Sequence, residues 1–353
     1  MHTKLSPMAS LFLFIFLASL TVRSAGDQNP LFTQSQKSYL IRYWNKQTGN
    51  GHTKPVFLLS KASPLSADES ASFSKLATTH NHSALSSRFS AFCASANLLC
   101  FPDSSLPTHT DAGCVFSYMC SFTYNNDKRS HTTGIFFRES MLKKGTVMPM
   151  PDIKDKLPER AFLPRSISSK LPFSTSKISE LKRVFHAGDN STMETMIVET
   201  LSDCEKAPSP GENKRCVGSA EDMIDFAISV LGSRNVAIRT TKNANGSKQS
   251  IMIGSVKGVN GGKVMQQSLS CHQSLFPYLV YYCHSVPKVR VYEADILDPN
   301  SKAKINHGVA ICHLKTSSWD PNHEAFLELG SGPGRIEVCH WIFENDLTWT
   351  VAD

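Results

Sequence analysis

Hydrophobic positions follow two different periods along this chain, helical in its earlier part and alternating near its end. Where apolar residues recur every three or four positions, one face of a helix is apolar and can pack on a core. The helix that begins at Ser219 is the best defined, because Asp222 completes a capping box and Gly232 supplies a stop. Helices are also predicted for residues 40–46, 68–77, 176–186 and 191–201, with Asp68 and Ser191 as N-terminal caps.

From residue 250 onward, short β-branched and aromatic segments alternate with turn residues, which is typical of β-strands. Helices first and strands afterwards predict an α+β fold whose strands form an antiparallel sheet or sandwich. The prolines between residues 148 and 172 exclude long helices there and predict an extended path over the surface. The predicted strands are residues 251–256, 263–269, 278–282, 289–294, 308–314, 325–329, 335–343 and 347–351.

The N-terminal segment has the layout of a secretory signal peptide. Lys4 precedes an apolar run over residues 11–22, and small residues follow at positions 24–26, so we expect cleavage near residue 25. The run is too short to cross a membrane, and no later stretch is long and apolar enough to do so. The sequence therefore predicts a secreted chain without a membrane segment after cleavage.

Cysteine usage agrees with export. The ten cysteines all follow the leader, and an even number in an exported chain favours disulfides. The pairing of Cys114 and Cys120 stays open, either with each other or with the Cys93/Cys100 pair. A local bridge is expected between Cys93 and Cys100, and a second one between Cys204 and Cys216, which flank a Pro/Gly loop.

Three Asn-x-Ser/Thr sequons, at Asn81, Asn190 and Asn245, are predicted surface sites of glycosylation. The formal net charge is +7 and falls by two to +5 when Lys4 and Arg23 leave with the leader. A basic exported chain is drawn to polyanions, although a merely solvated basic surface explains the charge equally well. We see no nucleic-acid-binding motif.

The dipeptide Cys-His occurs four times between residues 271 and 340, with gaps of 10, 27 and 25 residues. The flanks of these pairs read as strands, and neighbouring side chains on a strand point to opposite faces. Thiols can then gather on one side and form two disulfides, while the imidazoles gather on the other. The pairs are Cys271-His272, Cys283-His284, Cys312-His313 and Cys339-His340.

A cluster of His272, His284, His313 and His340 would be an all-nitrogen metal site, which suits copper better than a hard ion. Two alternatives stay open. Zinc can bind a mixture of Cys and His, although the short ligand spacings typical of such sites are absent. The four cysteines can also form structural disulfides beside four unrelated histidines, with no metal at all.

The spacing of these pairs, followed by Trp341 and the ending Glu344-Asn-Asp-Leu-Thr-Trp349, resembles the BURP domain of plant secreted proteins. The resemblance runs from about Gly134 to the C-terminus and includes the opening pair Phe136-Phe137. It implies a domain over residues 134–353, after a signal peptide (1–25), an N-terminal region (26–103) and a linker (104–133).

The N-terminal region resembles that of the non-catalytic beta subunit of plant polygalacturonase, in motifs such as Ile41-Arg-Tyr-Trp-Asn-Lys46. Members of that subgroup carry a long array of Phe/Tyr repeats between the two blocks, of which residues 104–133 hold at most a remnant. The resemblance implies an accessory protein of the cell wall that binds polygalacturonase or pectin and acts in cell expansion or development.

An enzyme is the alternative. Some BURP domains are copper-dependent peptide cyclases that crosslink Tyr or Trp side chains of a core peptide, and the four histidines would then be copper ligands. The short linker offers no repeated core peptide, which disfavours this function. We find no hydrolase motif. The acid pairs Asp295/Asp298 and Glu324/Glu328 are more typical of a solvated surface than of a glycosidase.

Overall fold

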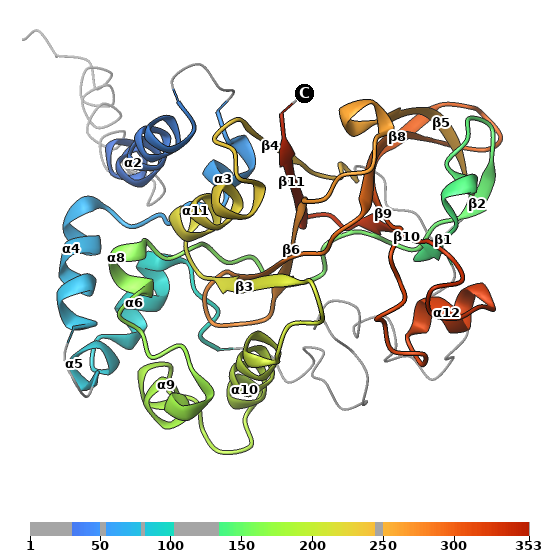
Figure 1. Ribbon diagram of the computed structural model, residues 1–353. Helices are drawn as coiled ribbons and strands as arrows, with labels where there is room; N and C mark the ends of the chain where they lie inside the picture. Colours follow the sequence, from blue (N-terminus) through green and yellow to red (C-terminus); the bar gives the residue numbers. More distant parts are fainter. Residues whose placement is uncertain (1–29, 50–53, 79–81, 102–133, 244–249, 353) are drawn as a thin grey trace, which may run out of the picture.

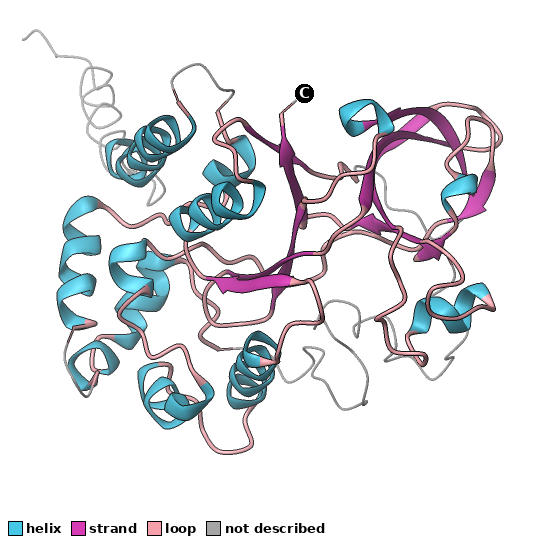
Figure 2. Cartoon of the chain, in the orientation of Figure 1, coloured by secondary structure: helices cyan, strands magenta, loops and turns pink. Residues whose placement is uncertain are grey.

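The structure is a computed structural model that describes residues 30–49, 54–78, 82–101, 134–243 and 250–352. Most of the helices gather on one side of the molecule and the two sheets lie toward the other, as Figures 1 and 2 show. The α+β prediction is confirmed, since both sheets are antiparallel throughout. No helix in the described ranges is both long and apolar enough to cross a bilayer.

The N-terminal region is helical. The predicted helix 40–46 is part of a longer one, α2, and the predicted helix 68–77 is α4. The cap of α4 is Ser66 and not Asp68, because Ser66 accepts a bond from the Glu69 backbone while Glu69 bonds back to the Ser66 N–H. The helices here are α2 (Pro30–Thr48), α3 (Val56–Ser60), α4 (Ala67–Leu76), α5 (Ser83–Ser86) and α6 (Phe89–Ala96).

The next section is also helical, and its last helix, α11 (Ala220–Leu231), packs on the five-stranded sheet (Figure 1). The predicted caps Ser191 and Ser219 accept backbone bonds from Glu194 and Asp222 at 3.1 Å each. Gly232 ends its helix in the left-handed conformation, at φ +61°. The elements are α8 (Arg165–Ser168), η2 (Thr175–Lys177), α9 (Ile178–Val184), α10 (Thr192–Glu205) and α11 (Ala220–Leu231).

A six-stranded sheet has the order β1-β10-β9-β8-β5-β2, and a five-stranded sheet has the order β3-β7-β6-β11-β4. Short 3-10 turns η1 (Glu139–Met141) and η3 (Val259–Gly262) flank the six-stranded sheet. Its strands are β1 (Phe136–Phe137), β2 (Val147–Pro149), β5 (Ser250–Gly258), β8 (Val289–Leu297), β9 (Lys304–His313) and β10 (Val338–Ile342). The other sheet contains β3 (Asn213–Val217), β4 (Val236–Arg239), β6 (Leu269–Ser274), β7 (Val280–Ser285) and β11 (Leu347–Val351).

Three local predictions are wrong. Residues 325–329 form helix α12 (Glu324–Leu329) and not a strand, because His323 caps its start and Gly330 ends it. Residues 263–269 are mostly a loop, since η3 breaks the extended chain and β6 begins only at Leu269. The proline-rich segment does not lie over the surface, because Ile153 and Leu163 are fully buried in the core.

The N-terminal helices share a core with the rest of the chain. Trp44 of α2 lies 6.0 Å from Trp349 of β11, measured between ring centroids. Leu40, Trp44 and Leu58 belong to the same buried cluster as Leu269 and Cys283 of the five-stranded sheet. Burial of apolar side chains is the main stabilising term in folding. Because these side chains are buried in one shared cluster, the N-terminal helices and the sheet stabilise each other.

Candidate metal centre

The cysteines of the four Cys-His pairs form two cross-strand disulfides. Cys271 of β6 is opposite Cys283 of β7, with their Cα atoms 3.9 Å apart. Cys312 of β9 is opposite Cys339 of β10, with a Cα distance of 4.0 Å. All four side chains are fully buried, one pair in each sheet. Consecutive pairs are therefore joined, which the spacing alone left open.

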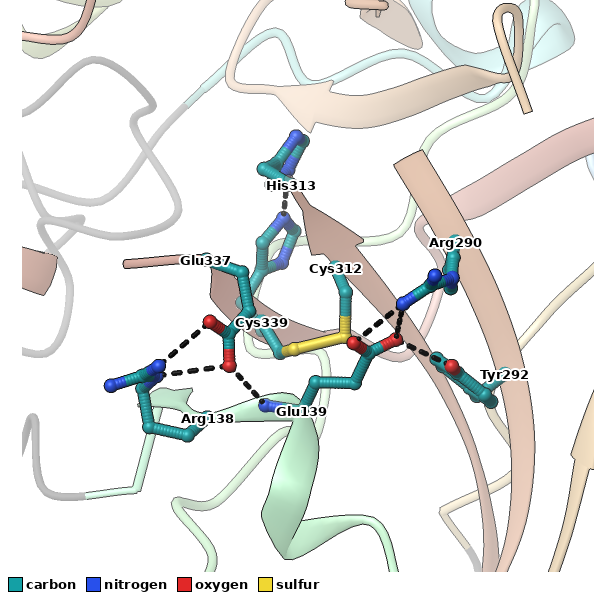
Figure 3. Close-up of a disulfide and its surroundings, with 9 residues drawn as sticks. Arg138, Glu139, Arg290, Tyr292, Cys312, His313, Glu337 and Cys339 are labelled. Carbon is teal, nitrogen blue, oxygen red and sulfur yellow. Dashed lines mark hydrogen bonds and ion pairs between the residues drawn. A yellow bond between two sulfur atoms is a disulfide. The ribbon is translucent and has the colours of Figure 1, made fainter. Parts of the chain in front are cut away.

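Each disulfide fixes where the next two side chains point. A histidine that follows a cysteine on a strand lies on the opposite face, because side chains alternate. Since the cysteines are directly opposite, the two histidines lie diagonally across the strand pair on one face. Figure 3 shows the Cys312–Cys339 disulfide on one side of its strands and His313 on the other.

The four rings lie together. Ring centroids are 5.4 Å apart for His272 and His284, and 5.3 Å apart for His313 and His340, whose planes are stacked at 15°. The two pairs meet across the sheets, where His272 and His340 are 6.3 Å apart. The predicted face of imidazoles is thus assembled from both sheets.

Three of the four imidazoles hold their Nδ1 atom against an acceptor. His272 Nδ1 lies 2.9 Å from Asp346 Oδ2, and His284 Nδ1 lies 2.9 Å from Glu212 Oε1. His340 Nδ1 lies 3.1 Å from the backbone oxygen of Trp341. Carboxylate and carbonyl oxygens only accept, so each Nδ1 carries the proton and donates it. The lone pair of each neutral ring is then on Nε2, which is the arrangement found at metal-ligating histidines.

The fourth ring, His313, differs from the other three. His313 Nε2 lies 3.2 Å from His340 Nε2, and the His313 Nδ1 atom is buried without a hydrogen-bond partner in the described part of the chain. Because His340 Nε2 bears a lone pair, His313 donates from Nε2 and keeps its own lone pair on the unpartnered Nδ1. An orphaned buried nitrogen of this kind calls for a ligand or water.

Burial favours the neutral form of three of these rings, His284, His313 and His340. It lowers the pKa of His340 to about 3, together with the neighbouring His272 and His284. The pKa of His313 also falls well below its ordinary value, through burial and the adjacent His340. Burial lowers the pKa of His284 too, more than Glu212 raises it. Metal ligation requires neutral imidazole, so these histidines need not lose a proton at physiological pH to bind an ion.

The two carboxylates that orient the rings come from outside the Cys-His pairs, although Asp346 lies in the ending Glu344–Trp349. Burial raises the pKa of Asp346, partly offset by the bonds from His272 and from the Gln273 N–H. Burial also raises the pKa of Glu212, but the His284 and Ser209 hydrogen bonds prevail and lower it to about 2. Neither carboxylate was predicted, because no sequence spacing relates them to the Cys-His pairs. Asp346 lies in the turn from β10 to β11 that crosses between the sheets.

Aromatic rings surround the cluster. Trp319 lies 5.2 Å from His313 and 4.7 Å from His323, between ring centroids. Tyr282 lies 5.5 Å from His284. His323 is thus near the cluster through Trp319, but its Nδ1 accepts from the Ala325 N–H as a helix cap. Oxidisable aromatic side chains therefore lie beside the imidazoles.

The donor set fits a soft or borderline metal ion, because it consists of imidazole nitrogens with oriented Nδ1 atoms. Among the residues that the structure describes, however, no three His, Cys, Asp or Glu side chains are already close enough to ligate one ion. The cluster is therefore a set of candidate ligands and not a formed coordination sphere.

A polar network braces the Cys312–Cys339 disulfide on its other side (Figure 3). Arg138 contacts Glu337 at 2.7 Å, and Arg290 contacts Glu139 at 2.8 Å. The Tyr292 hydroxyl donates to the same Glu139. These contacts attach η1 and β1 to β8 and to the segment before β10, so they hold the strand that carries His340 in register.

The other predicted sites have different outcomes. Disulfides join Cys93 to Cys100 and Cys204 to Cys216, as expected. Asn190 is exposed in the turn before α10. Asp295 pairs with Lys304, and Glu328 accepts the Gly134 N–H at 2.6 Å, so both acids have structural partners. Asn81, Asn245, Cys114 and Cys120 lie outside the described residues.

Comparison with known proteins agrees with the family resemblance found in the sequence. The BURP domain model matches residues 135–351. Polygalacturonase-1 non-catalytic subunit beta of Solanum lycopersicum is 75% identical over 220 residues, which cover 62% of this chain and 35% of the tomato protein. Polygalacturonase 1 beta-like protein 3 of Arabidopsis thaliana is 62% identical over 260 residues, 71% of this chain and 41% of that protein.

The chain thus spans little more than a third of the length of these relatives. A shorter relative matches throughout: BURP domain-containing protein 16 of Oryza sativa subsp. japonica is 47% identical over 360 residues, 98% of this chain and 99% of the rice protein. A short architecture, with little sequence between the N-terminal helices and the C-terminal domain, therefore occurs in a second protein.

Proposed function

This chain belongs to the BURP-domain family, and from that premise we propose that it is a secreted, non-catalytic protein of the plant cell wall that associates with polygalacturonase. One observation carries the proposal: the domain is nearly three-quarters identical to proteins named as non-catalytic subunits of polygalacturonase. Such identity over a whole folded domain preserves most surface positions and not only the core. A role in pectin turnover and cell expansion would follow from that association.

The fold supports a binding role for a rigid surface. Two sheets with a disulfide each, and helices that share their core, make a domain whose surface changes little on binding. The leader-like N-terminus, the disulfides and the exposed sequon at Asn190 support export. We place the protein in the apoplast for these reasons.

A pull-down tests the association. The purified full chain is immobilised and exposed to a plant polygalacturonase, with an unrelated basic protein of the same net charge as the control. We expect this chain, but not the control protein, to retain the enzyme. The amount of enzyme on this chain should stay the same at a salt concentration that washes the enzyme off the control. Equal recovery from both proteins, or from neither, would contradict the proposal.

We further propose that the histidine cluster binds copper. His272, His284, His313 and His340 would hold the ion, with Asp346 and Glu212 orienting two of the rings. Bound copper would supply one-electron redox chemistry. The chain itself contributes imidazole nitrogens, adjacent aromatic rings and fixed ring orientations.

Copper-dependent peptide crosslinking is the second candidate function. It is favoured by one observation, the aromatic side chains Tyr282 and Trp319 beside the imidazoles. Each crosslink between a side chain and a backbone atom removes two hydrogen atoms. Mass spectrometry of copper-loaded protein in air distinguishes the functions: an unchanged mass supports the binding role, and a loss of two hydrogens in the N-terminal segment supports the cyclase.

A further inference from the structure

A cavity of about 480 Å³ opens between the two sheets, away from the histidine cluster. One wall is formed by β4 and the residues after it, and the other by the start of β9, whose opposite end carries His313. Two backbone bonds join the walls: the Lys242 N–H donates to the His307 carbonyl at 2.8 Å, and the His307 N–H donates back at 3.0 Å. The volume is in the range of small-molecule sites.

Cations dominate the lining. Arg239, Lys242 and Lys304 all face the cavity, against Glu293 as the acid in its wall. The Arg239 side chain is only 11% exposed and is held in place, since Nη1 donates to Glu293 at 3.0 Å and Nε donates to Thr350 Oγ1 at 3.2 Å. A guanidinium that is fixed before binding loses little entropy when it meets a carboxylate.

The other two cations differ in their surroundings. Lys304 is exposed and pairs with Asp295, which lies just outside the lining residues. The exposed Lys242 ammonium has no carboxylate partner among the residues that the structure describes. The cavity therefore keeps an excess of positive charge after its internal ion pairs are counted.

The remaining lining distinguishes among anions. Glu293 lies inside the site and also 3.7 Å from His307 Nε2, so a compact anion such as phosphate, with all of its charge on one small group, meets a negative charge there. A sugar hydroxyl, in contrast, can donate to that carboxylate. Ile238 and Ile305 offer apolar surface to the C–H face of a pyranose ring.

We propose that this cavity binds a carboxylated sugar, a uronic acid residue of a polysaccharide chain. Arg239 and Lys242 would receive its carboxylate, and Glu293 and His307 its hydroxyl groups. The inference rests on the proposed location in a cell wall, where uronate polymers occur, but it does not require that the chain bind polygalacturonase.

Calorimetric titration of the full chain with a trigalacturonate tests the proposal. We expect saturable binding, at least tenfold weaker binding of the methyl-esterified trimer, and no competition by inorganic phosphate at equal concentration. Lys242→Gln is expected to weaken trigalacturonate binding about tenfold, because it removes a charge-assisted hydrogen bond. Lys304→Gln is expected to weaken it less, because Lys304 already pairs with Asp295 and contributes only to the positive charge of the cavity. Lys144→Gln removes one charge at an exposed site elsewhere and is expected to bind as the unmodified chain does.

Each negative result contradicts a different part of the proposal. Equal binding of the esterified trimer, or equal affinity of the two cavity variants and Lys144→Gln, would overturn the site. Displacement by phosphate would show a general anion site and overturn the sugar assignment. A failed polygalacturonase pull-down leaves the cavity result standing, whereas retention of the enzyme without trigalacturonate binding refutes this inference alone.

Discussion

Hydrogen bonds at Nδ1 decide what each histidine of the cluster can do. His272, His284 and His340 donate from Nδ1 to three different acceptors, which leaves their Nε2 lone pairs as the ligating atoms. Without those acceptors either nitrogen of each ring could carry the proton. The acceptors therefore select the tautomer of each ring before any ion binds. The effect of each acceptor can be tested by replacing it singly.

Replacing Glu212 by Gln should weaken metal binding at the cluster. The amide cannot match the charge-assisted bond that Glu212 makes to His284, and loss of such an outer partner typically costs 10–100-fold in metal affinity. Competition titration against a copper chelator measures the effect. Asp189→Asn, at an exposed carboxylate paired with Lys182, is the matched control and should leave the affinity unchanged. Equal affinities in both variants would contradict the orienting role.

The carboxyl group of Glu328 leads to a prediction about the pH dependence of stability. Burial raises the pKa of Glu328 from its ordinary 4.5 to about 7, more than the bonds from the Gly134 and Phe136 N–H groups lower it. A carboxyl whose pKa is raised on folding favours the folded state below the unfolded value and loses that contribution as pH rises. The unfolding free energy should therefore fall between pH 4.5 and 7, by about 1–2 kcal/mol after allowance for partial exposure.

Denaturant unfolding across this range provides the measurement. In Glu328→Gln the neutral side chain cannot titrate, so its stability should be flat over the interval in which the unmodified protein weakens. A Glu159→Gln variant, at an exposed acid elsewhere, should keep the original slope. The same slope in all three proteins would refute the assignment to Glu328.

At the scale of elements, the cross-strand disulfides set the register on which the cluster depends. A slip of one residue would send each imidazole to the cysteine face. The Cys204–Cys216 disulfide contributes in a different way, because the loop that it closes carries Glu212, the partner of His284. Three of the four described disulfides are thus connected to the histidines.

Removing the β6–β7 bridge should disrupt the cluster as well as stability. Cys271→Ala together with Cys283→Ala should cost roughly 2–4 kcal/mol of unfolding free energy and also abolish tight copper binding. Cys93→Ala with Cys100→Ala is the control, since that bridge lies at the end of α6, away from the histidines, and is also local, with a sequence separation of 7 against 12 for the β6–β7 bridge. It should lose stability but bind copper normally. Normal copper binding by the β6–β7 variant would show that the strands hold their register without the disulfide.

Elements that depend on local signals can be predicted from the sequence. Elements whose conformation or burial depends on tertiary packing cannot. The caps at Ser191 and Ser219, the stop at Gly232 and most strands after residue 250 are read directly from neighbouring residues. Residues 325–329 form a short, largely apolar run, and such a run is compatible with either a strand or a helix. Only the cap at His323 identifies this segment as a helix. The buried proline-rich segment also depends on packing, since its apolar residues fill the core between distant elements.

Within the site, alternation along strands predicts the face of imidazoles, whereas the orienting acids are not predictable. Asp346 and Glu212 reach His272 and His284 over 74 and 72 positions of sequence. No spacing rule links residues so far apart. The pairing of consecutive cysteines likewise follows from which strands are neighbours, and that order is a property of the sheets.

At the scale of the whole molecule, the N-terminal helices are an integral part of the fold. Residues 30–101 lie outside the matched domain, yet Trp44 packs against Trp349 and the Tyr43 hydroxyl donates to Asp225 at 2.6 Å. A boundary drawn from sequence at residue 134 therefore marks a family domain and not an independent folding unit.

Trp44→Ala should destabilise the entire protein. Deleting a buried aromatic side chain typically costs 3–5 kcal/mol, and Trp44 is only 2% exposed. Because the core is shared, we expect one thermal transition that moves to lower temperature. Tyr39→Ala, on the same helix but 43% exposed, should change little. Two separate transitions, with the later one unmoved, would show that the C-terminal domain folds alone.

The most direct test of the account is copper titration of the purified chain and of four single variants, His272→Ala, His284→Ala, His313→Ala and His340→Ala, with His307→Ala as the control. The account predicts that one binding event with nitrogen ligation, seen by electron paramagnetic resonance, weakens at least tenfold in each of the four and is unchanged in His307→Ala. No such event in the unmodified chain, or one that survives all four replacements, would contradict it.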